Sequence, residues 1–457
     1  MADTGPALGT DAAESSIVPA PAAAATPGAA ATPAGPGSAV TPSAAVGSSR
    51  LAWAEVDLDA ITANCAVLAG LARPAALCAV VKAGAYGHGA LPAAKAALAG
   101  GATWLAVALV EEGIALREGG IEARILLLSE PLPQVMEAAA ANGLTPTVYT
   151  PAGIEAARKA ASAAPGGGPL RVHVKIDTGM HRVGANPDEV LDVGLAVDAA
   201  AELHLEGLWT HLAAADEPEH DEFTAAQLRR FGEVRRRLAA AGIRPDLVHA
   251  ANSSALLAMV VAADQDRRGD PAGVSTLLPA GDDDRRRDRA GTTVRNDIVR
   301  CGITVYGYPP SAALADRVQL RPAMSLKAGV AYVRRLGAGE RLSYGLRYAL
   351  PTDSVIATVP LGYADGVPRR FSAVGGQALI GGRRLPIAGR VTMDQLLVDC
   401  GPDSTVAPGD EVVLLGRQGA ECIDATEWAA RLDTVPYEIL CGISGRVARR
   451  YLGGAGA

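Results

Sequence analysis

The chain has 457 residues, of which 49% are hydrophobic and 20% charged, and its formal net charge is −7. This length predicts roughly two or three domains with sizeable hydrophobic cores. The mildly acidic balance argues against binding to nucleic acid or to an anionic membrane surface. The six cysteines lack the spacing of a zinc site, so we expect reduced, mostly buried thiols, no metal and a cytoplasmic location.

Residues 1–49 consist almost entirely of Ala, Pro, Gly, Ser and Thr. Such a segment cannot bury enough apolar surface to offset its ordering entropy, so it is predicted to be disordered. It has neither the basic start nor the continuous apolar core of a signal peptide. No stretch reaches the roughly 18 uncharged apolar residues of a membrane span, so we expect a soluble protein without a membrane partner.

From residue 50 the pattern becomes that of a folded domain. Residues 53–57 are typical of a short strand, and apolar residues at 3–4 spacing predict a helix over 58–72. Between Ala-rich helical segments lie short β-type runs, at 76–82, 104–109, 124–129, 145–149, 171–177, 206–211, 247–251 and 297–301. The clearest helical segment has one apolar face, formed by Phe223, Leu228, Phe231, Val234 and Leu238, and it ends before Gly242. Eight strands separated by helices over about 250 residues favour an α/β fold, a (β/α)8 TIM-type barrel. A doubly wound sheet shows the same alternation, but no G-x-G-x-x-G follows the first strand.

The predicted barrel spans residues 50–320 and includes a charged insertion loop at 264–296. Because this loop mixes acidic and basic residues with Gly and Pro, it indicates a solvated segment and not a nucleic-acid patch. After about residue 320, glycine turns separate β-type runs at 325–334, 354–361, 377–380, 396–399 and 411–415. Residues 321–457 are therefore predicted to form a mostly β C-terminal domain with one helix near 425–432.

One lysine follows the first of the eight β-type runs and precedes a glycine-rich loop, in LCAVVKAGAYGHG (77–89). Burial lowers the pKa of a lysine and suits its amine to a Schiff base, and a glycine-rich loop can offer N–H groups to an anion. Pyridoxal phosphate requires both features, which makes Lys82 a candidate for its attachment. The alternative is a lysine that caps the strand and extends to solvent.

Polar residues lie at the ends of five predicted strands, including the one that carries Lys82. They are Lys82, Lys175, Asp177, His211, Asn252, Ser253 and Arg300. Barrel active sites lie at the carboxyl ends of the strands, so convergence of these side chains would form a catalytic site. The alternative is that strand ends are polar simply because they meet solvent.

Eight blocks carry a family resemblance: AVVKAGAYGHG (79–89), VKIDTGMHRVG (174–184), THLAAAD (210–216), HAANSS (249–254), VRCGITVYG (299–307), LSYG (342–345), PLGYADGVPRR (360–370) and GRVTMDQ (389–395). From about residue 50 to its end, the chain resembles the alanine racemases, barrel-fold enzymes that depend on pyridoxal phosphate. The resemblance leaves out only the N-terminal tail and the 264–296 loop. It implies racemisation of L- and D-alanine in the cytoplasm, supplying D-alanine for peptidoglycan.

Racemisation needs one group to remove the α-proton and another to return a proton on the opposite face. The resemblance implies that Lys82 holds the cofactor and is one base. It implies that Tyr344 is the other base, supplied by the second subunit of a homodimer. Because a tyrosine has an ordinary pKa of about 10, we expect positive neighbours or a hydrogen bond to lower it.

The resemblance also assigns the cofactor-binding residues. Arg300 would face the pyridine nitrogen, and because arginine keeps its proton, the ring would be a weaker electron sink. His211 would orient Arg300, although a buried core histidine is the alternative. The positions that match phosphate-binding residues are Tyr86, Ser253, Gly302 and Ile303, with Asn252 beside them.

Further residues match substrate-binding positions. Arg182 would contact the cofactor's phenolic oxygen and the substrate carboxylate, and Met393 would donate its backbone N–H to that carboxylate. Lys175 matches a lysine that is often carbamylated in the family, and a carbamate there would hold Arg182. The residues that match the corridor into the active site are Asp216, Tyr363, Arg369 and Arg390.

Three positions depart from the family pattern. Gly84 stands where an aspartate is usual, Thr392 where a cysteine is common, and Gly445 where a tyrosine binds phosphate and narrows the opening. The alternatives are therefore a racemase of serine or of a broader set of amino acids, or a cofactor-binding relative without turnover. The related barrel decarboxylases are disfavoured, because they place a carboxylate at the pyridine nitrogen where this chain has Arg300.

Overall fold

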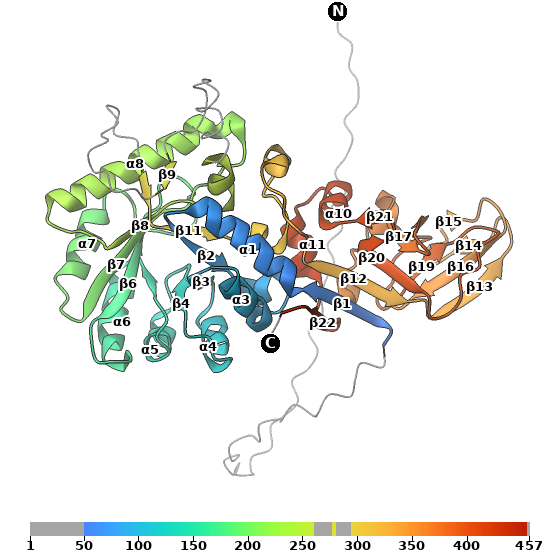
Figure 1. Cartoon of the computed structure of the whole chain (residues 1–457), viewed down its shortest axis with the longest axis horizontal. Helices are drawn as coiled ribbons and strands as arrows, with labels where there is room; N and C mark the ends of the chain where they lie inside the picture. The colour runs from blue at the N-terminus through green and yellow to red at the C-terminus, as the bar shows by residue number, and fades with distance from the viewer. Residues whose placement is uncertain (1–49, 260–276, 280–293, 455–457) are drawn as a thin grey trace, which may run out of the picture. The chain divides into compact units, whose positions relative to one another are not determined.

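The computed structural model describes residues 50–259, 277–279 and 294–454. Its N-terminal part contains eight parallel strands that pair in the orders β11-β2-β3-β4 and β5-β6-β7-β8 (Figure 1). Parallel bridges between Leu126 and Thr145 and between Asn252 and Arg300 join the two groups and close the barrel. The strands are β2 (Ala76–Val80), β3 (Trp104–Val107), β4 (Arg124–Leu127), β5 (Thr147–Val148), β6 (Leu170–Lys175), β7 (Leu203–Trp209), β8 (Leu247–His249) and β11 (Ile298–Cys301).

Each of the eight predicted β-type runs overlaps one of these strands, so the barrel prediction is confirmed and the doubly wound sheet is wrong. The strands β3 and β11 are buried at every position. This burial follows from the architecture, since side chains on one face fill the barrel and those on the other lie under the helices.

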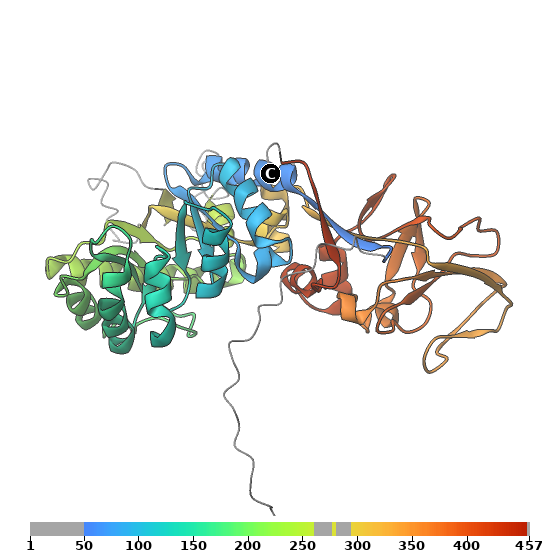
Figure 2. The same ribbon diagram turned by 90° about the horizontal axis from the view of Figure 1, so that it is seen from below.

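The helices pack around the outside of these strands, as Figure 2 shows. The first begins after Asp57, whose carboxylate accepts a hydrogen bond from the Ala60 N–H at 2.8 Å. In α8 (Asp221–Ala240), Phe223 was expected on the buried face but is exposed, and Thr224 and Gln227 are buried instead. The helices are α1 (Leu58–Ala72), α2 (Lys82–Tyr86), α3 (Ala90–Ala99), α4 (Val110–Glu118), α5 (Pro133–Ala141), α6 (Pro151–Ala160), α7 (Val190–Asp198) and α8 (Asp221–Ala240).

The C-terminal part is mostly β, as predicted. One sheet has the order β18-β17-β20-β12-β1-β22 with β21 on β20, a second the order β13-β16-β19, and β14 and β15 form a hairpin. The predicted elements at 377–380, 396–399 and 425–432 match β17, β19 and α10. The bounds are β12 (Met324–Gly329), β13 (Tyr332–Leu336), β14 (Arg341–Leu342), β15 (Tyr348–Ala349), β16 (Ser354–Val359), β17 (Gln377–Ile380), β18 (Arg383–Pro386), β19 (Leu396–Asp399), β20 (Glu411–Gln418), β21 (Glu421–Ile423), α10 (Ala425–Leu432), α11 (Pro436–Gly442) and β22 (Ala448–Leu452).

The strand β1 (Ala52–Asp57) differs from the prediction that residues from 50 onward belong to the barrel. It pairs antiparallel with β12 and parallel with β22, so it is part of the C-terminal sheet. Its buried and half-buried residues alternate, whereas β3 and β11 are buried throughout. This alternation is typical of a strand with one face on the core and the other toward solvent.

Two predicted segments fall largely outside the described residues. The tail 1–49 is outside them entirely, and the 264–296 loop is described only at its strands β9 (Leu277–Pro279) and β10 (Val294–Asn296), which pair in parallel. Of the helices in the described ranges, none is both long enough and apolar enough to cross a bilayer.

Trp428 on α10 gives a test of the C-terminal core. Its side chain is fully buried, and its ring centroid lies 4.2 Å from that of Phe371. Its Nε1–H has no hydrogen-bond partner among the described residues. We expect Trp428→Ala to lower the apparent free energy of unfolding by about 4 kcal/mol, because it leaves a cavity. We expect Trp428→Phe to cost less than about 1.5 kcal/mol, since it keeps most of the packing and removes the unpaired N–H.

Urea unfolding followed by circular dichroism measures both variants against the unchanged protein. Equal losses in the two variants would contradict this account, because Trp428→Ala removes far more of the packed ring volume than Trp428→Phe.

Candidate active site

Lys82 lies two residues beyond β2, at the carboxyl end of the barrel, and opens the single turn α2. The next three residues have left-handed backbone angles, with φ of 53°, 61° and 56° at Ala83, Gly84 and Ala85. Tyr86 also has a φ of 53°. Left-handed geometry costs an L-residue about 1–2 kcal/mol, and only Gly84 escapes this cost. Such strain is typical of segments that position functional groups.

This turn does not form the anion cradle that the glycine-rich sequence predicted. The Ala83 N–H donates to the Glu112 carboxylate at 2.6 Å. The N–H groups of Ala85, Gly87, His88 and Gly89 also donate, each to a nearby backbone carbonyl. The left-handed turn closes on itself, so these N–H groups are already used within the protein.

Four cationic side chains gather at this end of the barrel: Lys82, Lys175, Arg182 and Arg300. Burial and the neighbouring Arg182 lower the pKa of Lys82. Burial, followed by Arg300 and Arg182, lowers the pKa of Lys175 to about 7. The Lys175 Nζ lies 4.3 Å from the centre of the Trp209 ring, an aromatic partner that sequence analysis missed.

Arg300 lies within β11 and is almost completely buried. Its Nη2 donates to the carbonyls of Thr210 and Ala250 at 2.8 and 3.0 Å, and its Nη1 to His249 Nδ1 at 2.5 Å. The guanidinium also stacks 4.6 Å from the Trp209 ring centre. Burial lowers the pKa of Arg300 to about 10, so it stays protonated near neutral pH.

The guanidinium of Arg300 has a histidine partner that sequence analysis did not assign to it, His249. His211 does belong to the same cluster, because burial and then the nearby Arg300, Lys175, Arg182 and Lys82 hold its pKa well below the ordinary value. The guanidinium nevertheless donates its hydrogen bond to His249 Nδ1, at the end of β8. The signal for His249 was its place in HAANSS, the block that also supplied Asn252 and Ser253.

Three of the predicted phosphate-binding residues lie together beside the end of β11. The Gly302 N–H donates to Ser253 Oγ at 3.0 Å, and Ser253 Oγ lies 3.0 Å from Thr304 Oγ1. A Cβ at Gly302 would come within 2.4 Å of the Tyr86 hydroxyl oxygen. Only a glycine at position 302 leaves room for the hydroxyls of Tyr86 and Ser253 to approach the backbone. Two hydroxyls beside an open stretch of backbone suit the binding of a phosphate.

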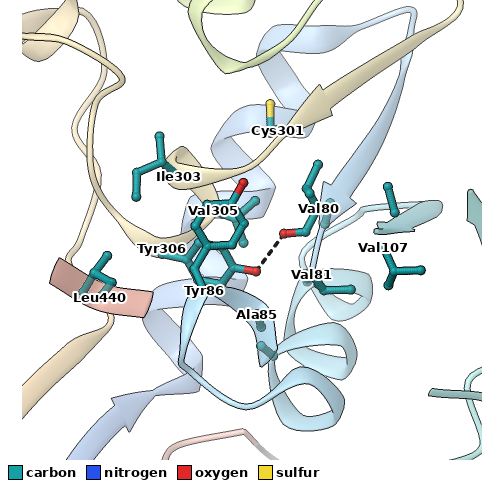
Figure 3. Packing of buried hydrophobic residues seen from close by; sticks show 14 of the residues in the cluster. Val80, Val81, Ala85, Tyr86, Val107, Cys301, Ile303, Val305, Tyr306 and Leu440 are labelled. Carbon is teal, nitrogen blue, oxygen red and sulfur yellow. Dashed lines mark hydrogen bonds between the residues drawn. The ribbon is translucent and has the colours of Figure 1, made fainter. Parts of the chain in front are cut away.

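The ring of Tyr86 is held in place by aromatic neighbours, as Figure 3 shows. Its centroid lies 4.9 Å from that of Tyr306, whose hydroxyl donates to the Val80 carbonyl at 2.8 Å. Ile303 opens the short 3-10 helix Ile303–Tyr306 and is buried next to this pair (Figure 3). The packing thus connects the end of β2 to the end of β11.

Two strand-end residues have structural partners of their own. Asn252 Oδ1 accepts from the Ala255 N–H at 3.0 Å, as a helix cap does. The carboxylate of Asp177 accepts from the N–H groups of Gly179 and His181 at 2.9 and 3.0 Å. For these two residues, the local structure explains a polar side chain without reference to a ligand.

A second group of predicted site residues gathers in the C-terminal part. Tyr344 lies in the β14–β15 turn, where Ser343 Oγ donates to the Arg390 carbonyl at 2.7 Å. The Tyr363 N–H donates to the Thr392 carbonyl at 2.9 Å, next to Met393. Tyr344 is 71% exposed and Met393 is 52% exposed. Among the described residues, no hydrogen bond connects Tyr344 to the cationic group of the same chain.

The remaining predicted residues are dispersed. Asp216 is half-buried in the barrel part, where its carbonyl accepts from Ser311 Oγ at 3.0 Å. Arg369 is exposed. A Cβ at Gly445 would meet no atom within 4 Å, so the position that departs from the family pattern faces open space.

Comparison with known proteins places this geometry in a family. The family models of the alanine racemase N-terminal and C-terminal domains match residues 56–269 and 323–451. A curated alanine racemase from Symbiobacterium thermophilum is 44% identical over 404 residues, covering 88% of this chain and 98% of the relative.

Solved structures agree with these matches. The alanine racemase of Streptomyces coelicolor has a TM-score of 0.76 and 38% identity, covering 89% of this chain and 98% of that one. A histidine racemase from Leuconostoc mesenteroides has a TM-score of 0.74 and 27% identity, covering 89% and 99%. With two family models that together cover most of the chain, and a relative at 44% identity, the chain belongs to the alanine racemase family.

Proposed function

We propose that this chain is an isomerase that interconverts L- and D-alanine with pyridoxal phosphate and supplies D-alanine for peptidoglycan. The observation that carries the proposal is the position of the Lys82 amine, whose pKa is lowered, among Lys175, Arg182 and Arg300 at the carboxyl end of the barrel. A concentration of positive charge there attracts an anionic cofactor and an anionic substrate. Membership of the alanine racemase family supports the reaction class.

The side chains present fit this cofactor. Lys82 would bind its aldehyde, and Arg300 would donate to its pyridine nitrogen. The hydroxyls of Tyr86 and Ser253 and the backbone at Gly302 and Ile303 would hold its phosphate, since the missing Cβ at Gly302 keeps that place open. When bound, pyridoxal phosphate withdraws electrons from the substrate and acidifies its Cα–H bond.

Residues of the chain itself would transfer the protons and hold the substrate. Because the pKa of Lys82 is lowered, a larger fraction of its amine can accept a proton near neutral pH. Tyr344 would exchange a proton on the opposite face of the substrate. Arg182 and the Met393 N–H would hold the substrate carboxylate and so fix the position of Cα. Arg300, which keeps its proton, would remain a hydrogen-bond donor throughout.

The exposure of Tyr344 supports a homodimer with shared active sites. A catalytic tyrosine that is 71% exposed in one chain needs a second surface to exclude water from it. We therefore propose that Tyr344 serves the site of the partner subunit. The residues proposed for the corridor into this shared site are Asp216, Tyr363, Arg369 and Arg390. A cytoplasmic location is supported by six free cysteines, of which four are buried.

The proposed reaction is tested by D-alanine formation from L-alanine with the purified, cofactor-loaded protein. We expect Lys82→Ala and Tyr344→Phe each to lower kcat/KM in both directions by at least about 10³-fold, because each enantiomer needs both bases. Lys159→Ala and Tyr332→Phe are matched controls, since both residues are exposed and lie outside the site.

Two outcomes would overturn parts of this proposal. A wild-type protein that binds the cofactor and forms no D-alanine would contradict the reaction. A Tyr344→Phe variant as active as Tyr332→Phe would remove Tyr344 from the role of second base.

The pKa of Lys175 supports carbamylation of this residue. Only the neutral amine forms a carbamate, and with a pKa lowered to about 7 by burial and Arg300, half of the amine is neutral near that pH. At fixed bicarbonate concentration, we expect carbamate occupancy to rise with pH through about 7 and to level off above it. Carbon-13 NMR with labelled bicarbonate measures this, with Lys175→Ala as control. No lysine-dependent signal at pH 8 would contradict carbamylation.

A second candidate function is racemisation of serine or a broader set of amino acids. The observation that favours it is the open space at Gly445, where a Cβ meets no atom within 4 Å. A missing side chain at the opening removes a contact that would discriminate against larger substrates, and a hydrophobic contact contributes about 1–3 kcal/mol of discrimination.

Gly445→Tyr separates this candidate from strict alanine specificity. If the open space admits larger substrates, the variant should raise the ratio of kcat/KM for alanine to that for serine by roughly 10-fold. Gly70→Tyr is the control, since a Cβ at Gly70 on α1 also meets open space. A wild-type protein inactive on serine would leave alanine as the substrate, and an unchanged ratio in Gly445→Tyr would show that the open space does not determine specificity.

A further inference from the structure

The buried Arg300 guanidinium is the start of a hydrogen-bonded chain through the barrel interior. Its Nη1 lies 2.5 Å from His249 Nδ1, and His249 Nε2 lies 3.0 Å from His173 Nδ1. His173 Nε2 lies 3.3 Å from Glu206 Oε2. We call these four residues the histidine relay. They come from β11, β8, β6 and β7, and all are buried.

The two ends of the histidine relay determine where each proton lies. Arginine can only donate, so His249 Nδ1 accepts and the proton of a neutral His249 is on Nε2. That Nε2–H donates to His173 Nδ1, so the proton of a neutral His173 is also on Nε2 and is donated to the Glu206 carboxylate. Burial favours two neutral rings, because it lowers the pKa of both histidines.

We propose that Glu206 is the remote counter-ion of Arg300, and that His249 and His173 are positioning residues that fix the guanidinium at the cofactor's pyridine nitrogen. The part of this inference that concerns the cofactor rests on the proposed function. The direction of the hydrogen bonds does not, since it follows from the side chains alone.

The charges at the two ends are complementary and poorly screened. Arg300 and Glu206 are each 3% exposed and the two histidines are fully buried, so their interaction is stronger than in water. Burial alone would raise the pKa of Glu206. The hydrogen bond from His173 and the nearby Arg124 and Arg171 outweigh that effect and lower it.

The rings of the histidine relay are also held in orientation. Trp209 stacks on His249 with an interplanar angle of 7° and a centroid distance of 5.5 Å, and it lies beneath the Arg300 guanidinium as well. At the other end, Arg124 Nη1 binds the second oxygen of Glu206 at 2.7 Å. A ring that is stacked and bonded at both nitrogens has one orientation left, which suits a positioning role.

The first test measures the tautomers directly in the cofactor-loaded wild-type protein. Nitrogen-15 NMR of histidine-labelled protein is expected to show both His249 and His173 neutral with the proton on Nε2, assigned by His249→Gln and His173→Gln. A proton on Nδ1 of either ring, or a charged ring, would overturn the histidine relay. A protein that shows these tautomers and forms no D-alanine would contradict the proposed function instead.

The second test removes the negative charge while keeping the shape. We expect Glu206→Gln to lower kcat by roughly 10-fold, as loss of an outer partner does. KM for alanine should stay within about 2-fold, since Arg300 does not bind substrate in this proposal. The absorption band of the bound cofactor should shift, because the donor at its ring nitrogen is held less firmly. A purely structural role would not move that band.

Arg171→Gln is the matched control, since Arg171 is 3.7 Å from Glu206, largely exposed and outside the histidine relay. We expect it to keep the wild-type absorption band and kcat. A folded Glu206→Gln protein with an unchanged band and unchanged kcat would overturn the counter-ion role. If Glu206→Gln fails to fold, the histidine tautomers measured in the wild-type protein decide whether the histidine relay is present.

Discussion

Positive charge concentrated at one end of a closed barrel is the constraint on which the rest of the site depends. Lys82, Lys175 and Arg182 gather there with Arg300. Beside burial, Arg182 lowers the pKa of Lys82, and Arg300, Arg182 and Lys82 lower the pKa of Lys175. The barrel imposes this arrangement, because the carboxyl ends of parallel strands meet on one face. The charge has two consequences that a racemase needs: it lowers the pKa of the lysine amines, and it stabilises phosphate and carboxylate groups.

Arginine and lysine respond differently to this shared environment. Burial lowers the pKa of Arg300 to about 10, so its guanidinium stays charged and donates in a fixed direction. Similar surroundings lower the pKa of Lys175 to about 7, which brings it into the range where the amine can react. One group is thus kept as a permanent donor and the other becomes a candidate for modification, although both lie within 5 Å of the Trp209 ring centre.

Local sequence predicted much of the fold, because strands and helices leave periodic patterns. The elements at 377–380, 396–399 and 425–432 were correct, since β-type runs between glycine turns indicate strands and a one-sided apolar pattern indicates a helix. Strand pairing is not local, and for that reason β1 was assigned to the barrel when it pairs with β12 and β22. Phe223 was misplaced because helical spacing alone does not fix which side faces the core.

Sequence analysis predicted most of the residues that gather in the site, but fewer of the contacts between them. Spacing placed Lys82, Lys175, His211 and Arg300 at strand ends, and the structure brings them together. The resemblance assigned His211 as the partner of Arg300 and did not indicate His249, because the choice of partner depends on side-chain direction. Nor could spacing show that the turn after Lys82 uses its own N–H groups, since a left-handed turn and an open glycine loop share a composition.

The shared active site can be tested by combining two inactive variants, Lys82→Ala and Tyr344→Phe, co-produced in one cell with different tags. If the lysine of one subunit works with the tyrosine of the other, half of the dimers are mixed and each of these has one intact site. The purified mixture should then regain about one quarter of the wild-type rate of D-alanine formation. A mixture as inactive as each variant alone would show that both bases act within a single chain, and would contradict the two-subunit site.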